Sequence, residues 1–139
     1  MSMSETADSG KPLCGFLLPE TIVQADGSGP TLALSASGGR TVLVTLGVTR
    51  TIEQESLDLS VWGSADGADW GAKPLAAFPQ KFYCGTYTLS VDLSARPEVK
   101  YLSVRWKLNR WGRGEPKPLF GLYVFGEQVS ASALTAAGQ

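Results

Sequence analysis

Histidine is absent from the 139 residues of this chain. Histidine is the most frequent general base in enzymes, the usual partner of a nucleophilic serine or cysteine, and the most frequent metal ligand. Its absence argues against hydrolysis by a catalytic triad. We therefore expect the protein not to be an enzyme, and we expect no cofactor.

Cysteine is scarce, and Cys14 and Cys84 stand far apart in the sequence. Two thiols without histidine are a poor ligand set for a metal. We expect two buried free thiols. A disulfide between them is the alternative, and it would require an oxidising compartment.

Long hydrophobic runs are missing as well. No window approaches the roughly 18 to 20 apolar residues of a membrane span. The apolar patch from Leu13 to Leu18 is too short for a usual signal peptide, and no basic segment precedes it. We expect no membrane span and a cytoplasmic location by default, with export by another route left open.

The residues that are present favour one domain of short strands. The chain is 43% hydrophobic, and its 16 glycines and 8 prolines separate short apolar runs. About seven or eight such runs occur without a convincing amphipathic helix. They predict a single antiparallel two-sheet β-sandwich over residues 12–127, jelly-roll or immunoglobulin-like in outline, with flexible tails at 1–11 and 128–139.

Residues 55–70 give the clearest strand signal. Three apolar residues alternate with three others, as in a strand with one buried face, namely Leu57, Leu59 and Val61 against Asp58, Ser60 and Trp62. Asp66 and Gly67 then offer the left-handed conformation of a tight turn, after which Trp70 restarts the apolar pattern.

A resemblance follows from this stretch and two later ones. Residues 64–70 read Ser-Ala-Asp-Gly-Ala-Asp-Trp, residues 100–105 read Lys-Tyr-Leu-Ser-Val-Arg, and a closing strand ends near Glu127. Over residues 55–127 this resembles the second half of discoidin-type (F5/8 type C-like) domains, which implies a galactose-binding-like jelly roll. Lys100 and Ser103 stand where the family usually has arginine, so its ligand residues are not carried over.

Acidic residues offer the only candidates for catalysis or metal binding. Glu53 with Glu55, or Asp66 with Asp69, are close enough in sequence to form the carboxylate pair of a hydrolase. Asp66 and Asp69, together with Asp58, are also candidate oxygen ligands for calcium. Solvated surface groups and the turn itself explain the same residues without either function.

Charge is unevenly distributed along the chain. Residues 96–117 carry seven basic and two acidic residues, while the rest carries five basic and eleven acidic ones, so the overall charge is −1. Trp111 lies in this basic stretch between Arg110 and Arg113. An exposed tryptophan between arginines can stack on a sugar ring or a base, or anchor a neighbouring subunit. The alternative is that Trp111 folds back over the sandwich.

Three functions remain, and nucleic acid is the least favoured partner because the chain is net acidic. The leading hypothesis is a structural module that forms a homo-oligomer or filament, with the Trp111 loop meeting the region around Asp58 to Asp69 of a neighbour, and with Trp62 as an added apolar contact. The runner-up is a lectin-like, glycan-binding module that uses Trp111 and Trp70. A hydrolase using the carboxylate pairs comes third.

Overall fold

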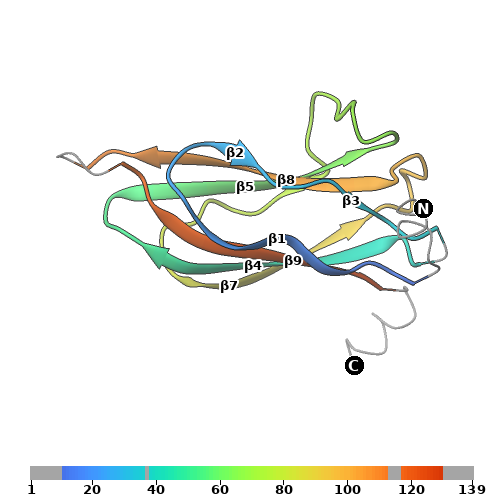
Figure 1. Ribbon diagram of the computed structural model, residues 1–139, viewed down its shortest axis with the longest axis horizontal. Coiled ribbons are helices and arrows are strands. Elements are labelled where there is room, and N and C mark those ends of the chain that lie inside the picture. The colour runs from blue at the N-terminus through green and yellow to red at the C-terminus, as the bar shows by residue number, and fades with distance from the viewer. Residues whose placement is uncertain (1–10, 37, 113–116, 130–139) are drawn as a thin grey trace, which may run out of the picture.

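The computed structural model describes residues 11–36, 38–112 and 117–129, and these form nine strands and no helix. No helix that could cross a bilayer is found in this part of the chain. Two antiparallel sheets stack as layers (Figure 1), which confirms the predicted all-β sandwich. The strands are β1 (Cys14–Val23), β2 (Gly27–Ser28), β3 (Leu32–Ala33), β4 (Thr41–Thr51), β5 (Glu55–Ser64), β6 (Ala76–Ala77), β7 (Gly85–Asp92), β8 (Tyr101–Arg110) and β9 (Phe120–Val129).

The strands pair in a nested order. The first sheet has the order β1-β9-β4-β7, and the second has the order β2-β8-β5-β6 with β3 also on β8. Because β2 and β3 pair with the same neighbour, they act as one interrupted edge strand. The first strand then pairs with the last, the second with the second-last, and so on inward. This nesting is a jelly-roll arrangement, and it reconciles nine assigned strands with the seven or eight predicted.

The core lies between the sheets and follows from the alternation in the sequence. Leu57, Leu59 and Val61 of β5 are at most 1% exposed, whereas Asp58 on the other face is exposed. Strands β4, β8 and β9 repeat the pattern with leucine, valine and Phe120. Each fully buried side chain of this kind contributes about 1.5 to 3 kcal/mol relative to exposure. The two inner faces therefore supply the main stabilisation of the fold.

Two elements end at other residues than the sequence predicted. Strand β9 continues to Val129, so the expected tail from residue 128 includes two strand residues, of which Gln128 is buried. The turn at Asp66 and Gly67 is present but forms part of a longer loop, because β5 pairs again only at Ala76 and Ala77. The rest of the predicted tails, residues 1–10 and 130–139, lies outside the described residues.

The expectation of buried thiols is wrong, because Cys14 and Cys84 are both free and exposed. Cys14 lies in β1 and Cys84 just before β7, which are the two outer strands of the first sheet. Three strand spacings separate those strands by about 14 Å. A disulfide needs its Cα atoms within about 7 Å, so the two thiols cannot pair within one chain.

Gln128 fastens one end of the sandwich. Its Oε1 accepts hydrogen bonds from the amides of Leu13 (2.7 Å) and Ser35 (2.9 Å). Its Nε2 donates to the carbonyls of Ser35 (3.1 Å) and Gly39 (3.0 Å). A carboxamide has two donor hydrogens and two acceptor lone pairs on its oxygen, so this buried side chain is fully satisfied. It joins β9 to two segments about a hundred residues earlier.

Replacing Gln128 by alanine should therefore lower the free energy of unfolding by about 2 to 4 kcal/mol, because buried amides and carbonyls lose their partners. Urea denaturation followed by circular dichroism measures this change. The exposed neighbour Glu127 provides the matched control, and its replacement by alanine should change stability by about 0.5 kcal/mol or less. Equal urea midpoints for the two variants would contradict the assigned role of Gln128.

Candidate functional site

Three aromatic side chains form an exposed cluster at one end of the sandwich. Trp111, Phe82 and Tyr83 are 53%, 38% and 75% exposed. The ring of Phe82 lies 6.2 Å from that of Trp111 and 6.2 Å from that of Tyr83, measured between centroids. Together with the turn at residues 51–55 they line a hollow of about 460 Å³. We call this cluster of three residues the aromatic end.

A buried carboxylate holds the turn beneath the aromatic end. Glu55 is 1% exposed. Its Oε2 accepts from the hydroxyl of Thr51 (2.7 Å) and the amide of Ile52 (2.9 Å), and its Oε1 accepts from the amide of Leu119 (2.8 Å). A buried carboxylate is tolerated only when its oxygens are hydrogen-bonded. Glu55 therefore ties the β4–β5 turn to the start of β9.

Trp111 is positioned by its own backbone. Its amide donates to the carbonyl of Gln54 (3.0 Å), and Gln54 has a left-handed φ of 62°. The guanidinium of Arg110 donates through Nη1 to the carbonyl of Glu53. Both bonds join the end of β8 to the β4–β5 turn. The indole is thus exposed on a backbone that two hydrogen bonds hold against this turn. Arg113, predicted to act with Trp111, lies outside the described residues.

Asp66 organises a second exposed loop, residues 64–71, which we call the acidic turn. Its Oδ1 accepts from the hydroxyl of Ser64 (3.0 Å) and from the amides of Ala68 and Asp69 (both 2.9 Å). Asp69 in turn accepts from the amide of Gly71 (3.0 Å), and Gly67 has the predicted left-handed φ of 82°. The backbone bonds from Asp69 and Ala68, and then the Ser64 hydroxyl, lower the pKa of Asp66 to about 2.

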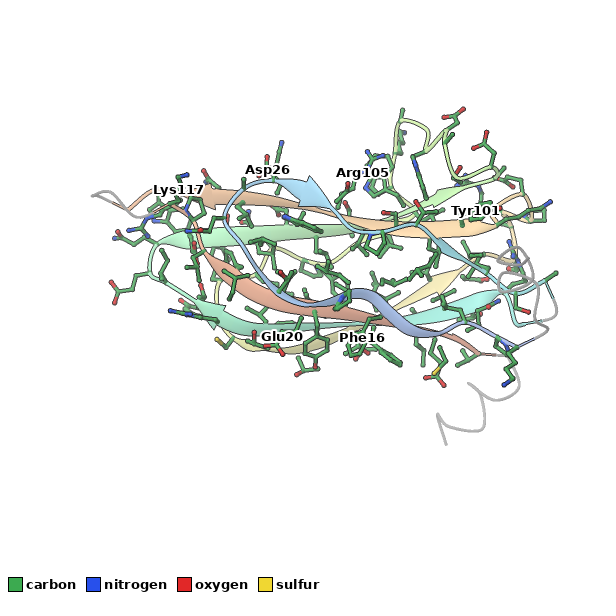
Figure 2. All side chains as sticks on the ribbon, in the orientation of Figure 1. Phe16, Glu20, Asp26, Tyr101, Arg105 and Lys117 are labelled. Atoms are coloured by element: carbon green, nitrogen blue, oxygen red, sulfur yellow. The ribbon has the colours of Figure 1, made fainter. Side chains whose placement is uncertain are left out.

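The aromatic end and the acidic turn lie at opposite ends of the molecule. Strand β5 starts at Glu55 beside Arg110 and finishes at Ser64 beside Tyr101. Ten strand residues span about 33 Å. Figure 2 accordingly shows Tyr101 and Lys117 at opposite ends of the long axis. The structure does not bring Trp111 and Trp70 together, as the predicted lectin-like site required, because Trp70 lies within the acidic turn at the opposite end of β5.

The basic stretch at residues 96–117 is not one surface either. It runs along β8, so Lys100 lies beside Ser64 at the acidic turn while Arg110 lies beside Glu55 at the aromatic end. Arg105 is midway between them (Figure 2). Arg96 forms an ion pair with Glu98 at 2.6 Å, which lowers the pKa of Glu98. The charge contrast in the sequence is consequently spread over the whole length of the sandwich.

Trp62 lies on the outer face of the second sheet, as predicted, but it is half-buried. The guanidinium carbon of Arg105 lies 3.9 Å from the centroid of its ring, and its Nε1 donates to the hydroxyl of Ser60 (2.8 Å). These residues border a hollow of about 540 Å³. Because Arg105 already covers one face of the indole, Trp62 offers less apolar surface to a partner than the sequence suggested.

The predicted carboxylate pairs serve the fold. Both oxygens of Glu55 accept hydrogen bonds from the chain, whereas Glu53 is exposed, so the two carboxyl groups lie in different environments. Asp66 and Asp69 each close a backbone turn, and Asp58 accepts from the amide nitrogen of Gln80 (3.0 Å). In the ranges that the structure describes, no three carboxylate or thiol groups are placed to hold a metal ion. These contacts lend no support to a hydrolase.

Sequence reasoning missed Phe82, Tyr83 and the structural role of Glu55. Glu55 shares its odd-numbered phase with Leu57 and Leu59, so strand periodicity places it on the buried face. That signal was available. The exposure of Phe82 and Tyr83 depends on residues 78–81 pairing with the edge of β5, through Phe78 and Lys81, before the chain crosses to β7. No local pattern indicates this crossing.

No protein-family model matches the chain, and neither a curated protein nor a solved structure matches it. The resemblance to discoidin-type domains therefore stays a prediction.

The lowered pKa of Asp66 has a consequence for stability in acid. A depressed folded-state pKa means that the ionised carboxylate stabilises the fold above its ordinary value of 3.8, and that this contribution is lost as the pH falls towards about 2. We expect the side-chain carboxyl of Asp66 to titrate at about pH 2 by carbon-13 NMR. The Asp66→Asn variant should lose melting temperature less steeply over the same pH range. A titration midpoint at or above 3.8 would contradict the hydrogen-bonded turn.

Proposed function

We propose that the chain is a non-enzymatic jelly-roll module that associates head to tail with copies of itself. The observation that supports this proposal most directly is the placement of the aromatic end and the acidic turn at opposite ends of the long axis. Two different surfaces at opposite ends make a heterologous contact. Repetition of such a contact gives a filament, or a ring where the rotation closes.

The chemistry of the two ends supports their contact. Tryptophan, tyrosine and arginine are the residues that most often dominate binding energy at protein interfaces. Arg50 is exposed in the last residues of β4 and Lys117 in the loop before β9, so two cationic side chains lie on segments that lead into this end of the sandwich. The acidic turn exposes Asp66, whose low pKa keeps it ionised, together with Asp69. Opposite charges steer such an encounter, and salt weakens it.

Glycan binding at the aromatic end is the second candidate function. It is favoured by the hollow of about 460 Å³, in which Tyr83 and Trp111 present rings beside the polar side chains of Glu53 and Gln54. Rings and a few polar groups around a hollow are typical of small-molecule sites. Trp70 takes no part in this version of the hypothesis.

Two variants that each damage one end separate these possibilities. The first carries Tyr83→Ser and Trp111→Ser, and the second carries Ala68→Arg and Asp69→Arg, all at exposed positions. We expect the unaltered protein to form species larger than one chain at low salt, and each variant alone to be a monomer. An equimolar mixture should form a dimer and nothing larger, because each variant keeps one intact end. Light scattering after size-exclusion chromatography measures the mass.

The matched control is Thr88→Arg, an exposed position in the middle of β7 and opposite Thr45 of β4, which should leave assembly unchanged. A monomeric unaltered protein at low and high salt would overturn the proposal. An unaltered assembly in either variant would overturn it as well. If the unaltered protein is a monomer, a glycan array tests the second candidate function: the unaltered protein should bind a glycan that the Tyr83/Trp111 variant does not.

A further inference from the structure

A second aromatic cluster lies on the outer face of the first sheet, away from both ends. Phe16 of β1 pairs with Phe125 of β9. Tyr123 lies on the same face of β9, two residues before Phe125. Their neighbours Leu17 and Val124 point inward and are fully buried. Strand alternation therefore projects the three rings outward, where Phe16 is 48% exposed.

The rings meet at right angles. The plane of Phe16 makes 86° with Tyr123 and 85° with Phe125, at centroid distances of 6.0 and 5.2 Å. The ring of Tyr123 lies against Gly47 of β4, where any Cβ atom would overlap it. Together with Thr45 and Glu20, the rings line a hollow of about 390 Å³. Perpendicular rings form a corner, so a ligand in it can contact more than one π-system.

Glu20 supplies the only charge around this hollow among the described residues, because no lysine or arginine there lines it. Glu20 is exposed, and in that part of the chain its carboxylate forms no ion pair. The pairing register of β1 shifts between Leu18 and Thr21, on either side of Glu20. Figure 2 shows Glu20 and Phe16 projecting from β1 on the side away from the second sheet.

Aromatic walls and one carboxylate suit a particular class of ligand. Ring faces attract a cation through their quadrupole, and such cages recognise quaternary ammonium groups. A primary ammonium carries three donors that need acceptors and is strongly hydrated, whereas the hollow offers few acceptors. A quaternary ammonium has no donor and an apolar methyl surface. We propose that this hollow, which we call the outer-face cage, binds a small quaternary ammonium cation.

Titration of the full chain with choline chloride, observed by NMR against matched sodium chloride, tests this proposal. We expect saturable shifts at Phe16, Tyr123 and Gly47, and none at Trp111. The neutral isostere 3,3-dimethylbutan-1-ol should bind at least fivefold more weakly, because it has the same shape without the charge. Phe16→Leu and Glu20→Gln should each weaken choline binding at least threefold, while Phe82→Leu at the aromatic end should leave it unchanged.

Each alternative outcome overturns the proposal. Equal binding of the isostere would show an apolar groove without cation recognition, and shifts only at Trp111 would place the ligand at the other cluster. Absence of saturable shifts in a protein with an unchanged melting temperature would leave no cation site.

If choline does bind, sedimentation with phosphatidylcholine vesicles, compared with phosphatidylglycerol vesicles, distinguishes a lipid headgroup from free choline as the source. The residues that line the outer-face cage are separate from those that line the aromatic end, so the proposed binding of the cation does not require self-association.

Discussion

The register of β9 is the constraint on which the rest of the structure depends. This strand lies between β1 and β4, and buried polar side chains hold both of its ends. Glu55 accepts a hydrogen bond from the amide of Leu119, just before β9. Gln128, the second-last residue of β9, binds the segments at Leu13 and Ser35. A slip of one residue would reverse every side chain of β9 and would leave buried donors and acceptors unpaired. The two polar residues thus specify one register where hydrophobic contacts alone permit others.

Much of this sandwich could be predicted from the sequence, because strand alternation is a local signal. It indicated the inner face of β5, which carries Leu57, Leu59 and Val61. The same phase also marks Glu55 with Leu57 and Gln128 with Val124 as inward residues. In the sequence analysis, Glu55 was instead a candidate for a carboxylate pair and Gln128 was assigned to the C-terminal tail. A polar residue in phase with a buried face is better read as a hydrogen-bonding group of the core.

The candidate sites were less accessible to sequence reasoning because they combine distant segments. Phe82 reaches Trp111 across 29 positions, and Phe16 reaches Phe125 only through the pairing of the first strand with the last. The nested pairing order of the strands brings these segments together, and this order cannot be deduced from the composition of the chain. Conversely, the lectin-like hypothesis placed Trp111 and Trp70 in one site. The length of β5 separates them.

The aromatic end and the outer-face cage both depend on the position of Glu55 and on the register of β9. Glu55 fixes the turn under Trp111 and also binds Leu119, just before β9 and four residues before Tyr123. Correct phase of β9 turns Tyr123 and Phe125 outward and keeps Leu122 and Val124 in the core. Gly47 then gives Tyr123 the room to lie across β4. One buried carboxylate therefore positions exposed rings on two separate surfaces, since both surfaces are built on strands whose register it determines.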